Sequence, residues 1–79
     1  MLDGAVLIEF LENDLGVDVT GVDGDTALFS SQLVDSFALV TLMMFLERQA
    51  EIRIVPADVN LDNMDSINKM LAYVGAKKA

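Results

Sequence analysis

The apolar residues of this chain recur at intervals of three and four residues in three segments, and this spacing limits its fold more than any other feature. The three segments are 2–15, 36–50 and 63–74. Such spacing lines apolar side chains along one face of an α-helix, and that face is buried against neighbouring helices. We therefore predict an all-α helical bundle that forms one domain over residues 1–79.

The predicted helix over 36–50 is apolar on both of its sides. One side carries Leu39, Leu42, Met43, Leu46 and Ala50. The opposite side carries Phe37, Val40, Thr41, Met44 and Arg48. Only one of these sides can face the core, so the other leaves an exposed apolar strip, a feature typical of binding surfaces. We assign Met43 to the core, because methionine usually fills gaps there.

The first connection, residues 16–35, is long for a helical bundle. It contains Gly21, Gly24 and several aspartates, which favour turns over regular structure. A loop of this length needs anchoring in a compact domain, and the apolar pair Leu28 and Phe29 is the expected anchor. At its end, either Asp35 or Ser36 can accept a hydrogen bond from the first turn of the next helix.

A short third helix is expected over 56–61, because proline favours the first turn of a helix. The last helix is expected over 63–74, with Asp62 as its cap and Gly75 as its stop. The Lys77 and Lys78 tail is expected to fray.

The composition excludes most enzyme classes. The chain has no cysteine and no histidine, so it cannot form disulfides, common zinc sites or nucleophilic centres that need either residue. A calcium loop with its glycine at Gly24 would place Val19 and Gly21 where carboxylates are required. In 79 residues little material remains to enclose a substrate pocket. We expect no catalytic residues and no metal site.

The charge is strongly acidic and unevenly distributed. Thirteen acidic and five basic residues give a formal charge of −8, and no lysine or arginine precedes Arg48. Such a surface repels nucleic acids and anionic lipids, and it favours partners with basic patches. The longest apolar stretch, 37–46, is too short to span a membrane, and the Met-Leu-Asp start is not a basic signal sequence. We expect a free-standing, monomeric protein of the cytoplasm that binds no nucleic acid.

Several features together resemble the acyl carrier protein superfamily. They are the long acidic loop, the stretch Leu33-Val34-Asp35-Ser36-Phe37 and the apolar-rich helix that follows it. The resemblance spans nearly the whole chain and implies a four-helix bundle of the acyl carrier type. It also implies that Ser36 carries a covalent 4′-phosphopantetheine derived from coenzyme A, with Asp35 as the acidic residue of the motif.

Within this superfamily, the stretches 33–37 and 65–69 look most like D-alanyl carrier proteins and other aminoacyl or peptidyl carriers. Phe37 departs from the usual leucine or methionine of the motif, and Gln32 stands where the family often has glycine. These departures concern the identity of the partners more than the attachment site.

The resemblance implies a set of partner enzymes. They are a Mg-dependent phosphopantetheinyl transferase, a ligase that activates an acyl or aminoacyl group, and downstream transferases or synthases. The cargo would travel as a thioester, and the chain itself would not be an enzyme. We predict that these partners dock on Phe37, Val40, Met44, Glu47 and Arg48, an apolar strip with a charged rim.

Other interpretations remain open at this stage. A serine at a helix start is often only a cap, and Phe37 could fold back into the core. The chain could also be a small acidic helical adaptor without a prosthetic group, or an unusual carboxylate enzyme. Substitution of Ser36 by alanine would leave an adaptor active, and would abolish the loading of a carrier.

Overall fold

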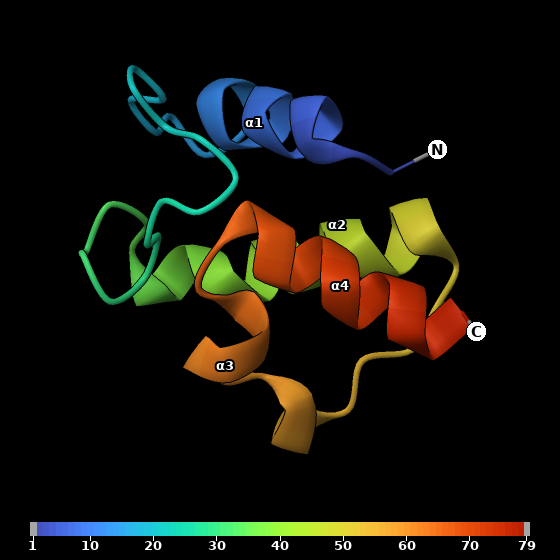
Figure 1. Cartoon of the computed structure of the whole chain (residues 1–79). Helices are drawn as coiled ribbons and strands as arrows, with labels where there is room; N and C mark the ends of the chain where they lie inside the picture. Colours follow the sequence, from blue (N-terminus) through green and yellow to red (C-terminus); the bar gives the residue numbers. More distant parts are fainter. Residues whose placement is uncertain (1, 79) are drawn as a thin grey trace.

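The computed structural model describes residues 2–78, and this part of the chain forms four α-helices and one short 3-10 helix without any strand (Figure 1). The elements are α1 (Gly4–Asn13), α2 (Ser36–Ala50), η1 (Pro56–Asp58), α3 (Leu61–Met64) and α4 (Ile67–Lys78). The predicted all-α bundle with a long first connection and a short third helix is confirmed.

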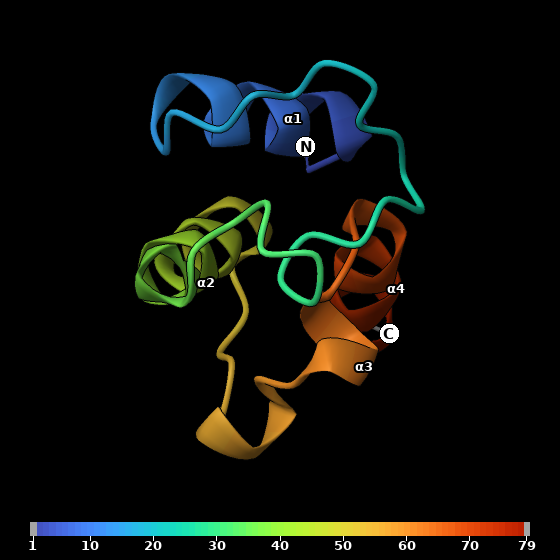
Figure 2. The ribbon, with the colours of Figure 1, turned by 90° about the vertical axis from the view of Figure 1, so that its left-hand side faces the viewer.

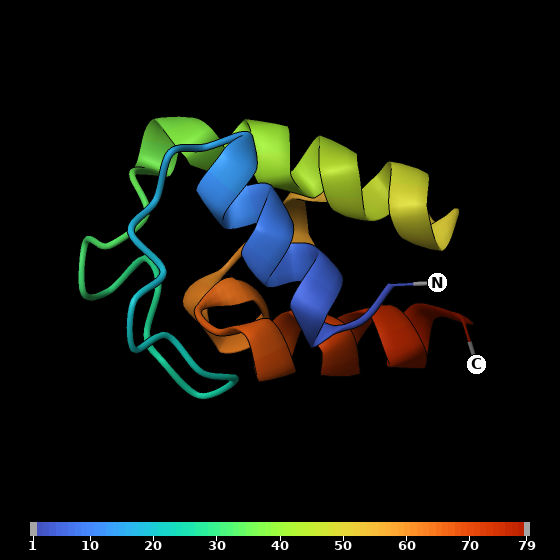
Figure 3. The ribbon, with the colours of Figure 1, turned by 90° about the horizontal axis from the view of Figure 1, so that it is seen from above.

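Helices α2 and α4 lie side by side and run in the same direction, and α1 crosses above both of them (Figures 2 and 3). The space between the three helices is filled by apolar side chains. These are Leu7, Phe10, Leu11, Leu28, Val34, Leu42, Met43, Leu46, Ala50, Met64, Ile67, Met70 and Val74. The loop between α1 and α2 closes the end of the bundle at which α2 begins (Figure 3).

The first helix is shorter than expected. It was predicted over 2–15 and spans Gly4–Asn13. Asp3 caps the N-terminus of the helix, because its carboxylate accepts a hydrogen bond from the Val6 amide at 2.9 Å. Beyond the other end, Gly16 adopts a positive φ of 68° that turns the chain away from the helix axis.

One apolar side of α2 is buried and the other is exposed, as predicted from the sequence. Leu42, Met43, Leu46 and Ala50 are buried, and Leu39 is partly buried. On the other side the exposed fractions of Phe37, Val40 and Met44 are 90%, 66% and 55%. Phe37 therefore does not fold back into the core.

The C-terminal half differs from the prediction. The expected helix over 56–61 is split into η1 and α3, and the Asn60 side chain caps α3 by accepting a hydrogen bond from the Asn63 amide at 3.0 Å. Asp62 is therefore not a cap but lies in the first turn of α3.

The last helix, predicted over 63–74, spans Ile67–Lys78. It starts later because the Ser66 hydroxyl accepts a hydrogen bond from the Lys69 amide at 3.1 Å, as a cap does. Gly75 lies within the helix and does not stop it. The tail is not frayed, because the Lys78 ammonium donates to the Ala50 carbonyl at 2.8 Å.

The long loop is anchored to the turn between α3 and α4. Leu28 is fully buried, and its amide donates to the Asp65 carbonyl at 2.7 Å. The Asp65 carboxylate accepts hydrogen bonds from the amides of Phe29 and Ser30 and from the Ser30 hydroxyl. The expected anchoring through Leu28 and Phe29 is confirmed. The residue that binds this loop segment is Asp65, which no sequence pattern indicated.

Two carboxylates hold the segment 51–60 against the helices. Glu47 of α2 accepts a hydrogen bond from the Ile54 amide at 2.8 Å. Asp58 accepts one from the Tyr73 hydroxyl of α4 at 2.7 Å and forms an ion pair with Lys77 at 3.7 Å. The segment is thereby fixed beside α2, where it forms one wall of the candidate site.

Candidate functional site

Ser36 is the first residue of α2, and its side chain is exposed. The residue before it, Asp35, has extended backbone angles and caps the helix, because its carboxylate accepts a hydrogen bond from the Phe37 amide at 2.8 Å. Asp35 is therefore the cap, a role that the sequence left open between Asp35 and Ser36. Within residues 2–78 the Ser36 hydroxyl makes no hydrogen bond, so it is available for chemistry.

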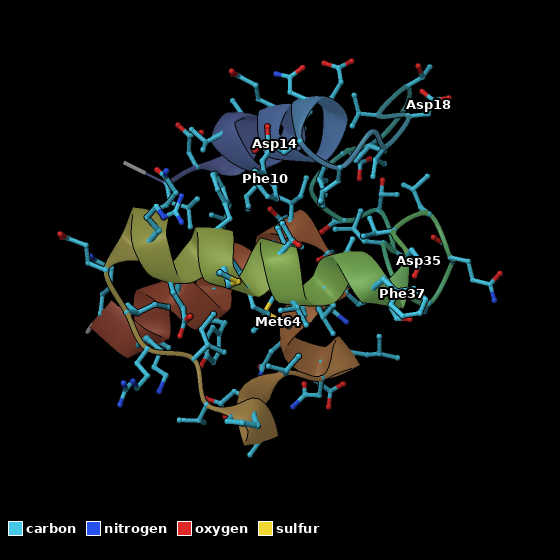
Figure 4. All side chains as sticks on the ribbon, turned by 180° about the vertical axis from the view of Figure 1, so that it is seen from behind. Phe10, Asp14, Asp18, Asp35, Phe37 and Met64 are labelled. Carbon is cyan, nitrogen blue, oxygen red and sulfur yellow. The ribbon has the colours of Figure 1, made fainter. Side chains whose placement is uncertain are left out.

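The backbone before α2 is anchored by one buried residue, and the three residues that follow it are exposed. Val34 is buried, and its amide donates to the Leu28 carbonyl at 2.9 Å. Gln32 adopts a positive φ of 65°, a conformation that favours glycine. This turn brings Asp35 and Phe37 to the surface at the start of α2, where Figure 4 shows them together.

An apolar cavity of about 230 Å³ opens beside Ser36. Its walls come from the long loop, α2, the segment after α2 and α3. They are Phe29, Ser36, Leu39, Val59, Asn60, Leu61 and Met64. Met64 lies below α2 in Figure 4, and Leu61 is 52% exposed. The cavity joins segments that are distant in the sequence, so periodicity alone gave no signal for Phe29 or Leu61 as site residues.

The Asp65 carboxylate fixes one wall of this cavity through hydrogen bonds to Phe29 and Ser30. Its pKa lies below the ordinary carboxyl value because the Ser30 hydroxyl and the amides of Ser30, Phe29 and Leu28 stabilise the charged form more than burial disfavours it. The charged carboxylate holds the backbone of Phe29, and Phe29 lines the cavity.

Four of the five residues predicted to dock partners are exposed on α2. Phe37, Val40, Met44 and Arg48 are exposed along its outer side. Glu47 differs from them, because it is half-buried and its carboxylate is bound to the Ile54 amide. It is therefore not a free charge at the rim of this surface.

A second groove, of about 380 Å³, runs along α2 between Val40 and Met44 on one wall and Ile54 and Pro56 on the other. Met43, Glu47, Leu39 and Val59 complete its lining. It continues from the cavity beside Ser36, because both share Leu39 and Val59.

Residues 2–78 lack two further kinds of site. This part of the chain contains no group of three or more acidic side chains arranged to hold a metal ion. None of its helices has the length and apolar character needed to cross a membrane.

Comparison with known proteins supports the resemblance found in the sequence. No family model matches the chain. A curated protein from Serratia sp. (strain ATCC 39006), named "Probable acyl carrier protein PigG", is 28% identical over 79 residues, which cover all of this chain and 91% of the relative. The aligned region therefore spans the whole of this chain. Together with the all-α fold, it confirms the resemblance of this chain to the acyl carrier protein superfamily.

Proposed function

We propose that this chain is a carrier protein whose Ser36 hydroxyl bears a 4′-phosphopantetheine arm. The observation that carries the proposal is the pairing of Asp35 with the Phe37 amide, which caps α2 and leaves the exposed Ser36 hydroxyl without a hydrogen bond in residues 2–78. The whole-length similarity to a protein named as a probable acyl carrier protein supports it.

The residues around Ser36 fit such a group chemically. A phosphodiester on Ser36 would lie near the positive end of the α2 dipole. The Phe37 and Ala38 amides there are already bonded to Asp35, so the dipole rather than these amides would favour the phosphate. The adjacent cavity is lined mainly by apolar side chains, such as Phe29, Leu39 and Met64, which can shelter apolar parts of an arm or its cargo. When bound, the arm would supply a thiol that holds cargo as a thioester.

The chain's own residues present the arm to partner enzymes. Asp35 fixes the first turn of α2, and Val34 anchors the preceding backbone in the core. The exposed side chains of Phe37, Val40 and Met44 then offer a small apolar surface next to Ser36. A surface of this size suits transient contacts, which let each partner release the carrier after reaction. Arg48 supplies a charge at the rim.

The partners in this proposal are a phosphopantetheinyl transferase, a ligase that loads an acyl or aminoacyl group, and synthases or transferases that use it. The chain acts in the cytoplasm as a non-catalytic monomer. A D-alanyl or other aminoacyl cargo remains a prediction from the stretches 33–37 and 65–69 alone.

The test is the intact mass of the purified chain after incubation with coenzyme A, Mg²⁺ and a broad-specificity phosphopantetheinyl transferase. We expect the parent protein to gain one phosphopantetheine and Ser36→Ala to gain none. Ser31→Ala is the matched control, because Ser31 is a nearby exposed serine. It should be modified like the parent. Modification of Ser36→Ala, or no modification of a folded parent by several transferases, contradicts the proposal.

The exposed apolar strip on α2 also supports a second function, that of an adaptor without a prosthetic group. An adaptor would remain unmodified in the mass experiment and would keep its partner binding after Ser36→Ala. It would lose that binding after Val40→Ser or Met44→Ser.

A further inference from the structure

Another surface groove lies between α1 and α2, away from the cavity beside Ser36 and distinct from the groove between Val40 and Pro56. It consists of two adjoining hollows of about 210 and 340 Å³ that share Phe10, Asp14 and Phe45. The remaining lining residues are Val6, Glu9 and Asn13 on α1 and Thr41, Met44, Arg48 and Gln49 on α2. The groove is large enough to take apolar side chains from another molecule.

The floor of this groove is aromatic. The rings of Phe10 and Phe45 stack with their centroids 4.0 Å apart and their planes inclined by 18°. Figure 4 shows Phe10 in the space between α1 and α2, whereas Phe37 lies at the N-terminal end of α2. Packed aromatic rings in a hollow are a common contact for an apolar anchor residue of a partner.

The α1 wall of the groove is acidic. Glu9 and Asp14 are exposed, and neither carboxylate accepts a hydrogen bond or forms an ion pair within residues 2–78, where Lys77 and Asp58 make the single ion pair. The part of the chain before α2 contains further acids and no base. They are Asp3, Glu12, Asp18, Asp23, Asp25 and Asp35.

This charge favours one kind of occupant. Nucleic acids and anionic lipids would be repelled by the acidic wall, and a second copy of this chain would bring another net charge of −8. A segment that carries lysine or arginine beside an apolar side chain would meet both the acidic wall and the aromatic floor. Arg48, the one base in the groove, lies on its α2 side and would favour an acidic group at one end of that segment.

We propose that the groove between α1 and α2 binds a basic amphipathic segment of a partner protein, with an apolar side chain against Phe10 and Phe45 and basic side chains beside Glu9 and Asp14. This surface does not include Ser36, Phe37 or Val40, and it shares only Met44 and Arg48 with the docking strip on α2. Binding of a partner in this groove would raise the local concentration of Ser36 near that partner's active site. The N-terminal end of α2 would remain uncovered and could enter the active site. The inference adds a partner site to the proposed function and does not depend on modification of Ser36.

The experiment is an NMR titration of the full chain, labelled with ¹⁵N, with a synthetic amphipathic peptide of leucine and lysine. The same peptide with glutamate in place of every lysine is the charge control. We expect the lysine peptide to shift the amide signals of residues 6–14 and 41–49 saturably at low salt. The Glu9→Gln/Asp14→Asn variant should bind it about fivefold more weakly, as the loss of two exposed ion pairs implies.

The matched variant is Glu51→Gln/Asp62→Asn, which removes the same charge at two exposed residues outside the groove. It should bind within about twofold of the parent if only local charge matters. Ser36→Ala should bind like the parent, so this result is independent of the mass experiment.

Four outcomes would overturn the proposal. They are equal weakening by the two acid-removing variants, equal binding of the glutamate peptide, shifts confined to the groove between Val40 and Pro56, and no saturable binding at low salt. A fifth outcome, self-association of the chain through residues 6–14, would replace the proposed partner with a contact between copies of this chain.

Discussion

The carboxylate of Asp65 accepts a hydrogen bond from the Ser30 hydroxyl at 2.6 Å, although 35 residues separate them in the sequence. Together with the amides of Phe29 and Ser30, this bond joins the long loop to the turn before α4. We predict that Asp65→Ala lowers the free energy of unfolding by about 2–3 kcal/mol, because several charge-assisted hydrogen bonds are lost at a buried site. Urea unfolding followed by circular dichroism measures this loss.

Ser30→Ala is the control for that variant. It removes only the hydroxyl donor and leaves both amide bonds, so its loss should be about 1 kcal/mol. An equal loss for the two variants would show that the amide bonds contribute little.

Acid should unfold the parent partly through Asp65. Its pKa is lower in the folded state than the ordinary 3.8 of the unfolded chain, so the unfolded state binds the proton first as pH falls. The stability that Asp65 contributes is therefore complete above pH 3.8 and is lost as pH falls through its folded-state pKa.

The measurement is urea unfolding at a series of pH values below 5 for the parent and Asp65→Asn. Asp18 and Asp23, whose pKa values are also lowered by hydrogen bonds, titrate in both proteins. The variant should therefore lose less stability than the parent over this range. Parallel curves would contradict the role given to Asp65.

Tyr73 should titrate at unusually high pH. Burial, the hydrogen bond to Asp58 and the negative charges of Asp58 and Glu47 raise its pKa to about 12. Since the unfolded chain loses this proton near pH 10, the contribution of Tyr73 to stability is present below pH 10 and is lost as pH rises toward 12. Tyr73 is the single tyrosine of the chain, so ultraviolet absorbance reports its ionisation alone.

The control is Asp58→Asn, which removes the neighbouring charge. This variant should move the midpoint of the tyrosine titration toward the ordinary value of 10. An unchanged midpoint would contradict the contribution of the Tyr73–Asp58 hydrogen bond.

Gln32 should gain stability when it is replaced by glycine. Its φ of 65° is unfavourable for a side chain with a Cβ atom, and Gln32 is exposed. We predict that Gln32→Gly raises the free energy of unfolding by about 0.5–1 kcal/mol, after the greater entropy of glycine in the unfolded chain is subtracted. Thermal unfolding measures the difference.

Gly21→Ala provides the opposite test. Gly21 has a φ of 77°, and an added Cβ would meet nothing within 4 Å, so any effect comes from the backbone. This variant should lose about 1 kcal/mol. A stabilising Gly21→Ala would show that positive φ carries no cost in this loop.

The features that the sequence predicted well are local ones. The two sides of α2 follow from helical spacing over 15 residues, and the burial of Met43 and the exposure of Phe37 agree with it. The start of α2 at Asp35 and Ser36 could also be found locally, because a cap and a helix start depend on neighbouring residues. The attachment role of Ser36 came from the family resemblance. That role stays a prediction until the mass experiment.

The features that it predicted poorly depend on distant contacts. Met64 fits the apolar spacing of the last helix, yet it belongs to α3 because Asp65 turns toward the loop and Ser66 starts α4. Glu47 resembles a surface charge in the sequence, but its carboxylate binds the amide of Ile54 once the chain folds back. No periodic pattern reports such pairings.

The cap on α2 belongs to Asp35, and the free hydroxyl belongs to its neighbour. The residue that caps the helix is therefore not the residue proposed for covalent modification. A group joined to Ser36 could be added, exchanged or removed without breaking the hydrogen bond that closes the helix. The capping of α2 is therefore separate from any chemistry at Ser36.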